Sequence, residues 1–303
     1  MNISINPTYY CNFRCDFCYL TPEQLSDRNL LPIDLLSEKL AEIISHTNID
    51  MVDIYGGEIG LLPESYWNEL ILMLHNYGID DINLITNLSM INSVTEDNRV
   101  HTSVSYDFEA RESSEKVWRN MALLNKEFSV LMLASPTLIK QDVDYMVNMF
   151  NTLGNLISVE IKPYSANQAN QLQVSYTDYE EFVKKWIQNK NKKFQLNNTL
   201  LLDTVLDGSR NSFSDDHVYI TPSGNYGVLE FDLNENEFFK EYKTFKEYLG
   251  WCNLEKERVS NNKFCSKCDY YGKCLSEHLR DVKNIENSCN GFVNLIEWYK
   301  NEQ

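Results

Sequence analysis

Three cysteines lie close together near the start of the chain, in the stretch YYCNFRCDFCYL at residues 9–20. Cys11 and Cys15 are separated by three residues, and Cys15 and Cys18 by two. An iron–sulfur cluster with four irons needs a ligand for each iron, so three thiolates leave one iron open to an exogenous molecule. A structural zinc ion usually takes four protein ligands, and no further cysteine or histidine lies close in sequence to complete a zinc site here.

A second group of cysteines lies near the C-terminus, in FCSKCDYYGKC at residues 264–274 and at one later position. The group consists of Cys265, Cys268, Cys274 and Cys289. Four thiolates form a complete ligand set for either an iron–sulfur cluster or zinc, and we keep both interpretations. His278 is a further candidate ligand, although a lone histidine is more often a packing residue. Cys252 is left over, and an inert buried thiol is the simplest role for it.

The elements that must position these residues follow from the hydrophobic pattern of the first two-thirds of the chain. The expected strands cover 2–8, 50–57, 81–87, 101–106, 128–135 and 156–164, and the expected helices cover 35–46, 65–78, 114–126 and 141–154. This alternation predicts a parallel sheet or barrel with helices outside. Functional sites of such folds lie at the C-terminal ends of the strands, where Cys11 follows the first one.

The composition of the chain changes after about residue 190. The stretch HVYITPSGNYGVLEF (217–231) is expected to form a hairpin, because Pro, Gly and Asn favour a turn at PSGN. Five of the eight cysteines then follow between residues 252 and 289. We therefore predict two domains, covering 1–205 and 206–303.

The net charge of −17 argues against a nucleic-acid partner, because little in the chain would neutralise phosphates. A basic peptide partner is compatible with this charge, and so is an acidic surface that serves solubility. The sequence shows no signal peptide and no apolar run of the ~20 residues that a membrane span needs. We expect a cytoplasmic protein, in which clustered cysteines bind metal more often than they form disulfides.

The spacing CxxxCxxC, followed by an aromatic residue, resembles the signature of the radical S-adenosylmethionine (SAM) enzymes. Three later segments are also similar to motifs of that family: YGGEIG (55–60), LITNLSMI (84–91) and SVSYDFEARESSEKVWRNMALL (103–124). The first resembles the GGE motif, with Ile59 where the family usually has proline. The second is similar to the family's TN motif, and the third to its SxD segment.

This resemblance implies a set of residues that contact SAM. Glu58 would hold the amino group, Ser105 the ribose and Arg119 the carboxylate, with Arg111 as a second candidate for the carboxylate. The full implied set is Tyr19, Gly56, Gly57, Glu58, Asn87, Ser105 and Arg119. The resemblance also implies that SAM chelates the open iron of a [4Fe-4S] cluster. Reductive cleavage of SAM would give a 5′-deoxyadenosyl radical, which abstracts hydrogen from the substrate.

The C-terminal cysteines resemble those of the SPASM subgroup of this family. Cys265, Cys268, Cys274 and Cys289 match four positions that ligate one auxiliary cluster there. Position 278 is histidine where that subgroup has cysteine, and the hairpin lacks the cysteine that the subgroup usually carries. The resemblance therefore implies one auxiliary [4Fe-4S] cluster. The implied fold is α/β, a partial (β/α)6 TIM-type barrel with a C-terminal cysteine-rich auxiliary domain of the SPASM or twitch type.

The subgroup includes enzymes that modify ribosomally made peptides, so the leading hypothesis is a peptide maturase that forms a side-chain cross-link. Its implied partners are a peptide substrate and a reductant such as flavodoxin or ferredoxin. The substrate's leader would be recognised by a separate protein or by the hairpin edge. One alternative is a peptide epimerase with Cys252 as hydrogen donor. Another is a small-molecule dehydrogenase or a carbohydrate-modifying enzyme.

Acid–base residues are not assigned by the sequence. Five side chains fall at or near expected strand ends that should face the cavity: Tyr106, Asp107, Glu160, Lys162 and Tyr164. Ion pairs inside a barrel explain most such residues equally well.

Overall fold

The computed structural model describes residues 1–108, 111–163, 174–232, 237–276, 289 and 291–302, apart from the side chains of 229–232 and 237–239. Ten strands within these residues form one sheet. The strands are β1 (Asn2–Ile5), β2 (Met51–Ile54), β3 (Ile82–Thr86), β4 (His101–Ser105), β5 (Phe128–Leu133), β6 (Leu156–Lys162), β7 (Gln195–Leu196), β8 (His217–Ile220), β9 (Tyr226–Asp232) and β10 (Glu237–Tyr242).

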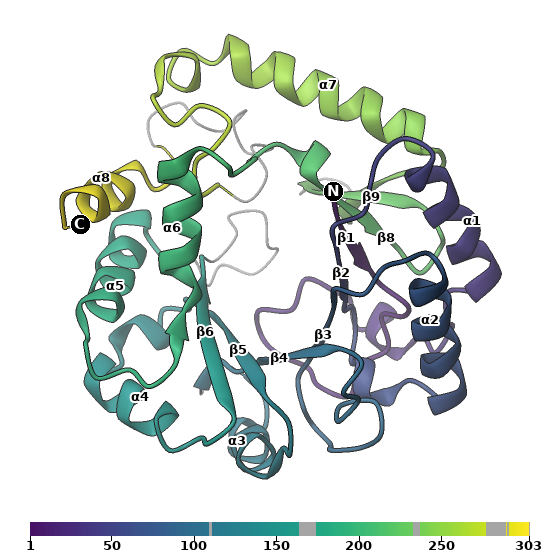
Figure 1. Cartoon of the computed structure of the whole chain (residues 1–303), viewed down its shortest axis with the longest axis horizontal. Helices are drawn as coiled ribbons and strands as arrows, with labels where there is room; N and C mark the ends of the chain where they lie inside the picture. The colour runs from purple at the N-terminus through teal and green to yellow at the C-terminus, as the bar shows by residue number, and fades with distance from the viewer. Residues whose placement is uncertain (109–110, 164–173, 233–236, 277–288, 290, 303) are drawn as a thin grey trace.

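Helices follow the strands along the chain and cover the outer face of the sheet (Figure 1). They are α1 (Ile33–Ile44), α2 (Glu64–Asn76), α3 (Ser114–Leu123), α4 (Val143–Phe150), α5 (Tyr176–Gln188), α6 (Asn197–Asp207), α7 (Phe245–Asn261) and α8 (Val293–Glu302). Their apolar residues recur at helical spacing. Helix α4, for example, buries Val143, Met146, Val147 and Phe150, which lie on one face.

The sheet order is β10-β9-β8-β1-β2-β3-β4-β5-β6-β7. Strands β1 to β6 are neighbours in chain order and pair in parallel, as the alternation of strands and helices predicted. They curve into an incomplete barrel (Figure 1). All six predicted strands and all four predicted helices are present. The observed strands end one to three residues earlier than predicted, because the residues after them form the loops that build the site.

The predicted hairpin is also present and extends the barrel sheet. Strands β8 and β9 are antiparallel around the turn, and β8 pairs in parallel with β1, with Asn2 opposite His217 and Ser4 opposite Tyr219. Residue 205, where the domain boundary was predicted, lies within α6, and Val205 is buried in a core cluster with barrel residues. The division into two domains stays a prediction.

Two apolar cores pack the helices against the sheet. One lies under β4 to β6 and helices α3 to α6 and also takes in Phe292, Leu295 and Ile296 near the C-terminus. The other lies under β1 to β3, α1 and α2 and continues into β8, β9 and α7. Because each core joins early and late segments, the C-terminal part of the chain is packed against both flanks of the barrel.

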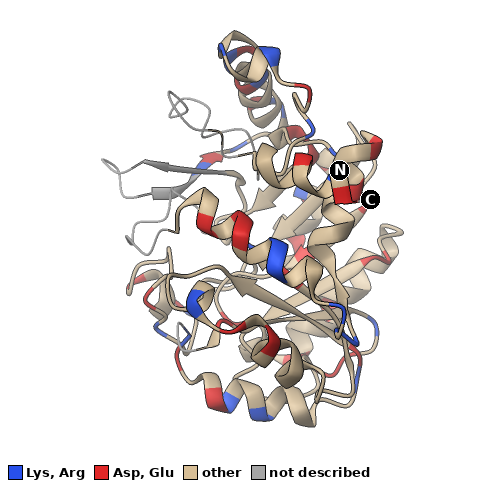
Figure 2. Ribbon diagram, turned by 90° about the vertical axis from the view of Figure 1, so that its left-hand side faces the viewer, with Lys and Arg blue, Asp and Glu red and all other residues tan. Residues whose placement is uncertain are grey.

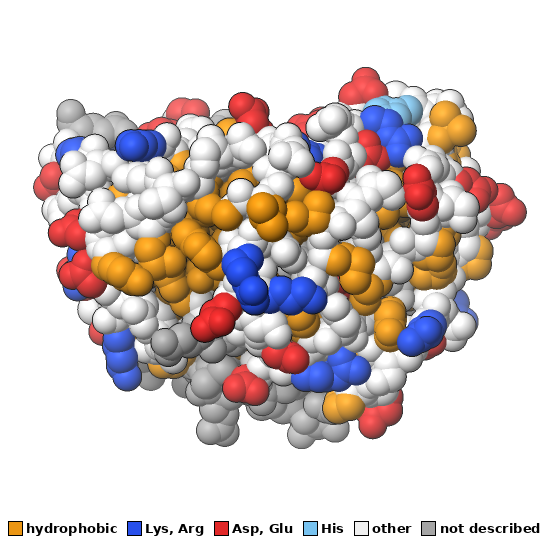
Figure 3. All heavy atoms as spheres, turned by 90° about the horizontal axis from the view of Figure 1, so that it is seen from below, with side chains coloured by type: hydrophobic (Ala, Val, Ile, Leu, Met, Phe, Trp, Pro, Cys, Tyr) orange, Lys and Arg blue, Asp and Glu red, His pale blue; other side chains and the backbone are white. Residues whose placement is uncertain are grey.

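Charged residues are spread over the helices that surround the sheet (Figure 2). Seen from below, the surface carries a band of hydrophobic side chains interrupted by residues of both charges (Figure 3). Among the described residues, no helix combines the length and the hydropathy that crossing a membrane requires.

Candidate active site

A cavity of about 330 Å³ lies inside the barrel, at the C-terminal ends of the parallel strands. Most of the residues that the sequence selected for the SAM site line it. These are Cys11, Cys15, Cys18, Tyr19, Gly56, Gly57, Asn87 and Ser105. They come from the loops after β1, β2 and β3 and from the last residue of β4. The structure thus gathers residues spread over nearly a hundred positions of the sequence around one space.

The cysteine loop is held by backbone contacts that leave the three thiols half-buried at the cavity. Cys11 N donates to Leu25 O at 3.1 Å, Cys18 N donates to Cys15 O at 3.0 Å, and Phe13 N donates to Cys11 Sγ at 3.4 Å. Burial raises the pKa of Cys11 to about 11 and also raises the pKa of Cys15 and Cys18. Binding of a metal cluster must therefore displace thiol protons. Three adjacent thiols facing one cavity fit a cluster with one open position.

Gly56 and Gly57 let the loop after β2 pack directly on the loop that carries the cysteines. Gly57 N donates to Thr8 O at 2.9 Å, and Glu58 N donates to Tyr10 O at 2.8 Å. A Cβ atom on Gly57 would lie 2.0 Å from Tyr10 O, and one on Gly56 would lie 2.4 Å from Thr8 O. Both glycines are therefore needed for the close approach of two backbones beside Cys11.

Glu58 does not line the cavity, in contrast to the sequence-based expectation of a direct SAM contact. Its carboxylate is fully buried and accepts hydrogen bonds from Thr86 Oγ1, from Asn87 N at 2.7 Å and from Gly60 N at 2.8 Å. Burial raises the pKa of Glu58, and these three hydrogen bonds oppose that rise. Glu58 thus ties the loop after β2 to the end of β3, where Asn87 reaches toward the cysteine loop.

Asn87 lies at the start of a long loop between β3 and β4. Its Nδ2 donates to Asn12 Oδ1 at 3.3 Å and contacts Cys11 Sγ at 3.7 Å. Further along this loop, Asn92 Nδ2 donates to Gly60 O at 2.8 Å, which links the loop to the segment after Glu58.

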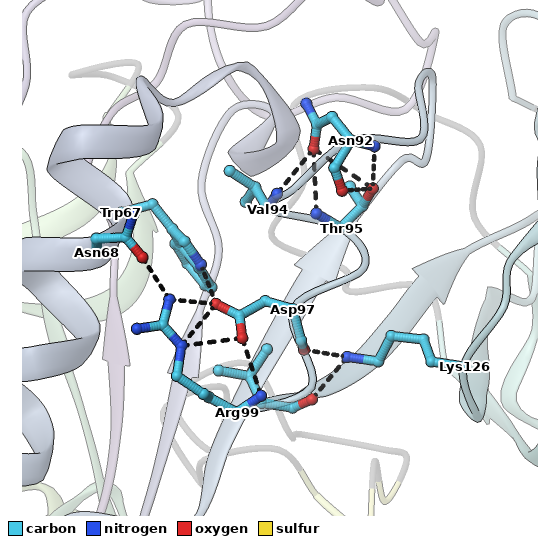
Figure 4. A network of polar contacts seen from close by, with 9 residues as sticks. Trp67, Asn68, Asn92, Val94, Thr95, Asp97, Arg99 and Lys126 are labelled. Atoms are coloured by element: carbon cyan, nitrogen blue, oxygen red, sulfur yellow. Dashed lines mark hydrogen bonds and ion pairs between the residues drawn. The ribbon is translucent and has the colours of Figure 1, made fainter.

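The rest of the loop is anchored by the polar network in Figure 4. Asp97 accepts hydrogen bonds from Trp67 Nε1 at 2.7 Å and from Arg99 Nε at 3.0 Å. Lys126 Nζ donates to the backbone oxygens of Asp97 and Val100 at 2.5 and 2.7 Å. These contacts join the later part of the loop to α2 and to the segment after α3.

Arg111, the second candidate for the SAM carboxylate, lines the cavity, whereas Arg119 does not. Arg111 donates to Asp107 Oδ2 through Nε at 2.9 Å, lies 3.9 Å from Cys15 Sγ and packs over the Phe17 ring. Arg119 is exposed on α3, where its Nε donates to Glu115 O at 3.4 Å. Arg111 therefore lies where a contact with the SAM carboxylate is possible and Arg119 does not line that cavity, while the contact itself stays a prediction.

Several cavity residues were missed by the sequence analysis. Ser4 and His217 meet across the β1–β8 pair, with Ser4 Oγ 2.7 Å from His217 Nε2. Asp53 also lines the cavity, accepts a hydrogen bond from Asn83 Nδ2 at 2.7 Å and has its pKa raised by burial. Asn2 and Ser4 alternate with isoleucine in β1, and Asp53 interrupts the apolar residues of β2, which indicates a polar barrel interior. Nothing in the sequence predicted that β8 would join β1.

Aromatic residues form one wall of the cavity. Tyr19, Tyr55 and Tyr219 line it, and the Tyr55 and Tyr219 rings meet edge to face with centroids 6.2 Å apart. Burial raises the pKa of Tyr19 and Tyr55 well above the usual range, so these phenols stay protonated. Tyr19, selected as the aromatic residue after the last cysteine, packs against Tyr219 of the hairpin.

Some of the acid–base candidates line the cavity and others do not. Lys162 and Asp107 line the cavity, and Lys162 lies 3.6 Å from Glu160. Asp107 is committed to Arg111 and to the backbone N–H of Leu133. Tyr106 is buried in an aromatic cluster with Phe108 and Trp118 and does not line the cavity. Tyr164 and His278 lie outside the described residues.

A second cavity, of about 220 Å³, is lined by all four C-terminal cysteines: Cys265, Cys268, Cys274 and Cys289. Backbone N–H groups point at two of these sulfurs, from Tyr270 to Cys268 at 3.4 Å and from Gly291 to Cys289 at 3.2 Å. A Cβ atom on Gly291 would lie 2.9 Å from Cys274 Sγ. Four thiols around one space, with amides donating to sulfur, fit an iron–sulfur cluster.

Cys252 lies apart from both cavities. It is 1% exposed on α7 and packs in the core under β1 to β3, and burial raises its pKa to about 12.

Among the described residues, no three or more His, Cys, Asp or Glu side chains are grouped closely enough to hold a single metal ion.

Solved structures of other proteins share the fold of this chain. The chain superposes on anSMEcpe with bound AdoMet at a TM-score of 0.67 and 17% identity, covering 100% of both chains. It superposes on Streptococcus suis SuiB bound to S-adenosylmethionine at 0.65 and 14%, covering 93% of this chain and 74% of SuiB. SuiB bound to its precursor peptide SuiA matches at 0.63 and 17%, with 96% and 74% covered.

Two of these neighbours contain bound SAM, and one contains a precursor peptide. The chain shares their fold, so the predicted fold class and the resemblance behind it are confirmed at that level. No protein-family model matches the chain. The GTP 3′,8-cyclase of Staphylococcus carnosus is 35% identical over 94 residues, 28% of this chain. That match spans about a quarter of the cyclase, 26% of its length.

Proposed function

We propose that the protein is a radical SAM enzyme. Cys11, Cys15 and Cys18 would hold a [4Fe-4S] cluster, and SAM would occupy the 330 Å³ cavity beside it. The observation that carries this proposal is the gathering of the three thiols, Gly57, Asn87 and Ser105 around that one cavity. When bound, the cluster and SAM supply a radical that abstracts hydrogen from the substrate.

The residues of this chain would bind and orient SAM. Arg111 offers a largely buried guanidinium beside the cysteine loop, and its ion pair with Asp107 fixes its direction. We assign it the SAM carboxylate. Ser105, at the end of β4, would contact the ribose. Glu58 would act indirectly, by holding Asn87 and the loop after β2.

The proposed substrate is a ribosomally made peptide, and the proposed reaction is formation of a side-chain cross-link. Support comes from SuiB, a structural neighbour that is bound to a precursor peptide in one of its structures. The four cysteines around the second cavity would hold one auxiliary [4Fe-4S] cluster. A flavodoxin or ferredoxin would supply electrons, and a separate protein or the hairpin edge would recognise the leader.

The geometry does not favour the epimerase alternative, in which Cys252 would be the hydrogen donor. Cys252 is buried in an apolar core and does not line the cavity, so it cannot reach a substrate there without rearrangement. The polar residues of the cavity, Ser4, Asp53 and His217, keep a small-molecule substrate as the second candidate.

The test is a metal count on protein purified and reconstituted without oxygen. We expect about eight irons and eight sulfides per chain, falling to about four in a variant with Cys11, Cys15 and Cys18 replaced by alanine. About four irons with one zinc would instead make the C-terminal site structural.

Incubation with SAM, a reductant and short peptides encoded beside the gene, followed by mass spectrometry, tests the substrate. A mass loss of two hydrogens supports the cross-link.

A further inference from the structure

One segment of this acidic chain is basic. The whole chain carries a formal charge of −17, yet residues 256–274 contain five basic residues and only two acidic ones. The basic residues are Lys256, Arg258, Lys263, Lys267 and Lys273, and the acidic ones are Glu257 and Asp269. The segment begins in the last turns of α7 and runs through three of the four C-terminal cysteines.

The outward side of this segment combines positive charge with exposed aromatic rings. Lys263 and Lys267 are exposed, and neither pairs with a carboxylate within the described part of the chain. Phe264 is 47% exposed and Tyr271 is 40% exposed, and Lys263 Nζ lies 5.1 Å from the Phe264 ring centroid. We call these four residues the carrier face. Large exposed apolar side chains rimmed by charge are typical of protein contact sites.

The carrier face also adjoins the proposed auxiliary cluster. Phe264 and Tyr271 line the same 220 Å³ cavity as the four cysteines, so each ring has one side toward the cavity and part of its surface toward solvent. A protein that docks on these rings would be separated from the cluster site by a single layer of side chains. Among the described residues that line this cavity, Phe264 and Tyr271 are the aromatic residues with exposed rings.

We propose that the carrier face is the docking surface for a small acidic electron-carrier protein of the flavodoxin or ferredoxin class. The inference rests on the proposed radical SAM function. Opposite charges would steer the carrier to Lys263 and Lys267, although the rest of the chain repels it. In each encounter the reduced carrier loses one electron and an iron–sulfur centre of this protein gains it, with no bond made or broken. The contact is of the weak, transient kind.

The test compares two double charge reversals on the reconstituted full-length enzyme. Lys263→Glu/Lys267→Glu alters the carrier face, and Lys243→Glu/Lys246→Glu makes the same charge change beside the start of α7, where both lysines are exposed. With an acidic flavodoxin at low salt, we expect the first variant to bind at least tenfold more weakly in calorimetry and to be reduced at least tenfold more slowly. The second should stay within twofold of the wild type. Lys263→Ala/Lys267→Ala should give an intermediate loss.

Reduction by dithionite separates this inference from the proposed function. We expect every variant to be reduced by dithionite and to make 5′-deoxyadenosine from SAM at the wild-type rate. Equal losses in both charge reversals, or no loss in either, would overturn the docking surface and leave the radical SAM proposal intact. An iron-loaded wild-type enzyme that cleaves no SAM even with dithionite would overturn the proposed function itself.

Discussion

At the scale of single residues, the two arginines near the SxD segment give the sharpest contrast. Arg111 is in the cavity, paired with Asp107 and 3.9 Å from Cys15 Sγ, whereas Arg119 is exposed on α3. We predict that Arg111→Gln weakens SAM binding at least tenfold, about 1.4 kcal/mol or more, because a charge-assisted contact to the carboxylate is lost. Arg119→Gln should leave the affinity within twofold.

Equilibrium dialysis with labelled SAM on the reconstituted protein measures both affinities. Equal effects of the two substitutions, or a loss only for Arg119→Gln, would show that the carboxylate contact is misassigned. Iron content should be compared in parallel, because Arg111 also lies near a cluster ligand.

Glu58 gives a second prediction at this scale. Both of its carboxylate oxygens accept hydrogen bonds in a fully buried position. The amide nitrogen of glutamine cannot accept the bond from Asn87 N, so Glu58→Gln should lower the free energy of unfolding by about 1–3 kcal/mol. The exposed Glu69→Gln on α2 should change it by less than about 0.5 kcal/mol. Urea denaturation measures both, and a neutral Glu58→Gln would mean that the carboxylate does not brace this loop.

The residues of the site show where sequence reasoning succeeds and where it stops. The spacing of Cys11, Cys15 and Cys18 was sufficient to predict a shared site, because neighbours in sequence must be neighbours in space. Spacing could not decide between Arg111 and Arg119, because that choice depends on where α3 begins. It also could not show that Thr86 and Asn87 would donate hydrogen bonds to the Glu58 carboxylate, because these contacts join the loop after β2 to the end of β3.

At the scale of elements, the packing of the loop after β2 on the loop after β1 is the critical contact. A Cβ atom at Gly57 would lie 2.0 Å from Tyr10 O, one residue from Cys11. We predict that Gly57→Ala separates the two loops and lowers the iron bound at the first site by at least half. Gly250→Ala is the control, because nothing lies within 4 Å of its Cβ position on α7.

Iron content per chain and the thermal midpoint of both alanine variants test this contact. Helix α7 should tolerate or gain from its alanine, because glycine is a poor helix former. Full iron loading of Gly57→Ala would show that the cysteine loop does not depend on this close approach.

The elements themselves were mostly predictable from the sequence. Periodicity located β1 to β6 and α1 to α4 because each buries one face against a core, and burial imposes the pattern. The partner of β8 was not predictable. Its sequence signals a hairpin, but its parallel pairing with β1 joins residues more than two hundred positions apart, and this pairing places His217 beside Ser4 in the cavity.

At the scale of the whole molecule, the two cysteine groups lie on one continuous scaffold. The barrel sheet runs through β8 to β10, and each apolar core contains residues from both the early and the late parts of the chain. The first cavity opens among the strand ends, and the second lies between α7 and α8 along the chain. This arrangement agrees with the proposed function, in which the first site binds SAM and substrate and the second holds an auxiliary cluster.

The most direct test of this account is the formation of 5′-deoxyadenosine from SAM by the reconstituted, dithionite-reduced protein without oxygen. We predict that the wild type releases 5′-deoxyadenosine and methionine in equal amounts. The variant with Cys11, Cys15 and Cys18 replaced by alanine should release neither while keeping the iron of its C-terminal site. A fully iron-loaded wild type that forms no 5′-deoxyadenosine, with SAM bound and the clusters reduced, would contradict the assignment as a radical SAM enzyme.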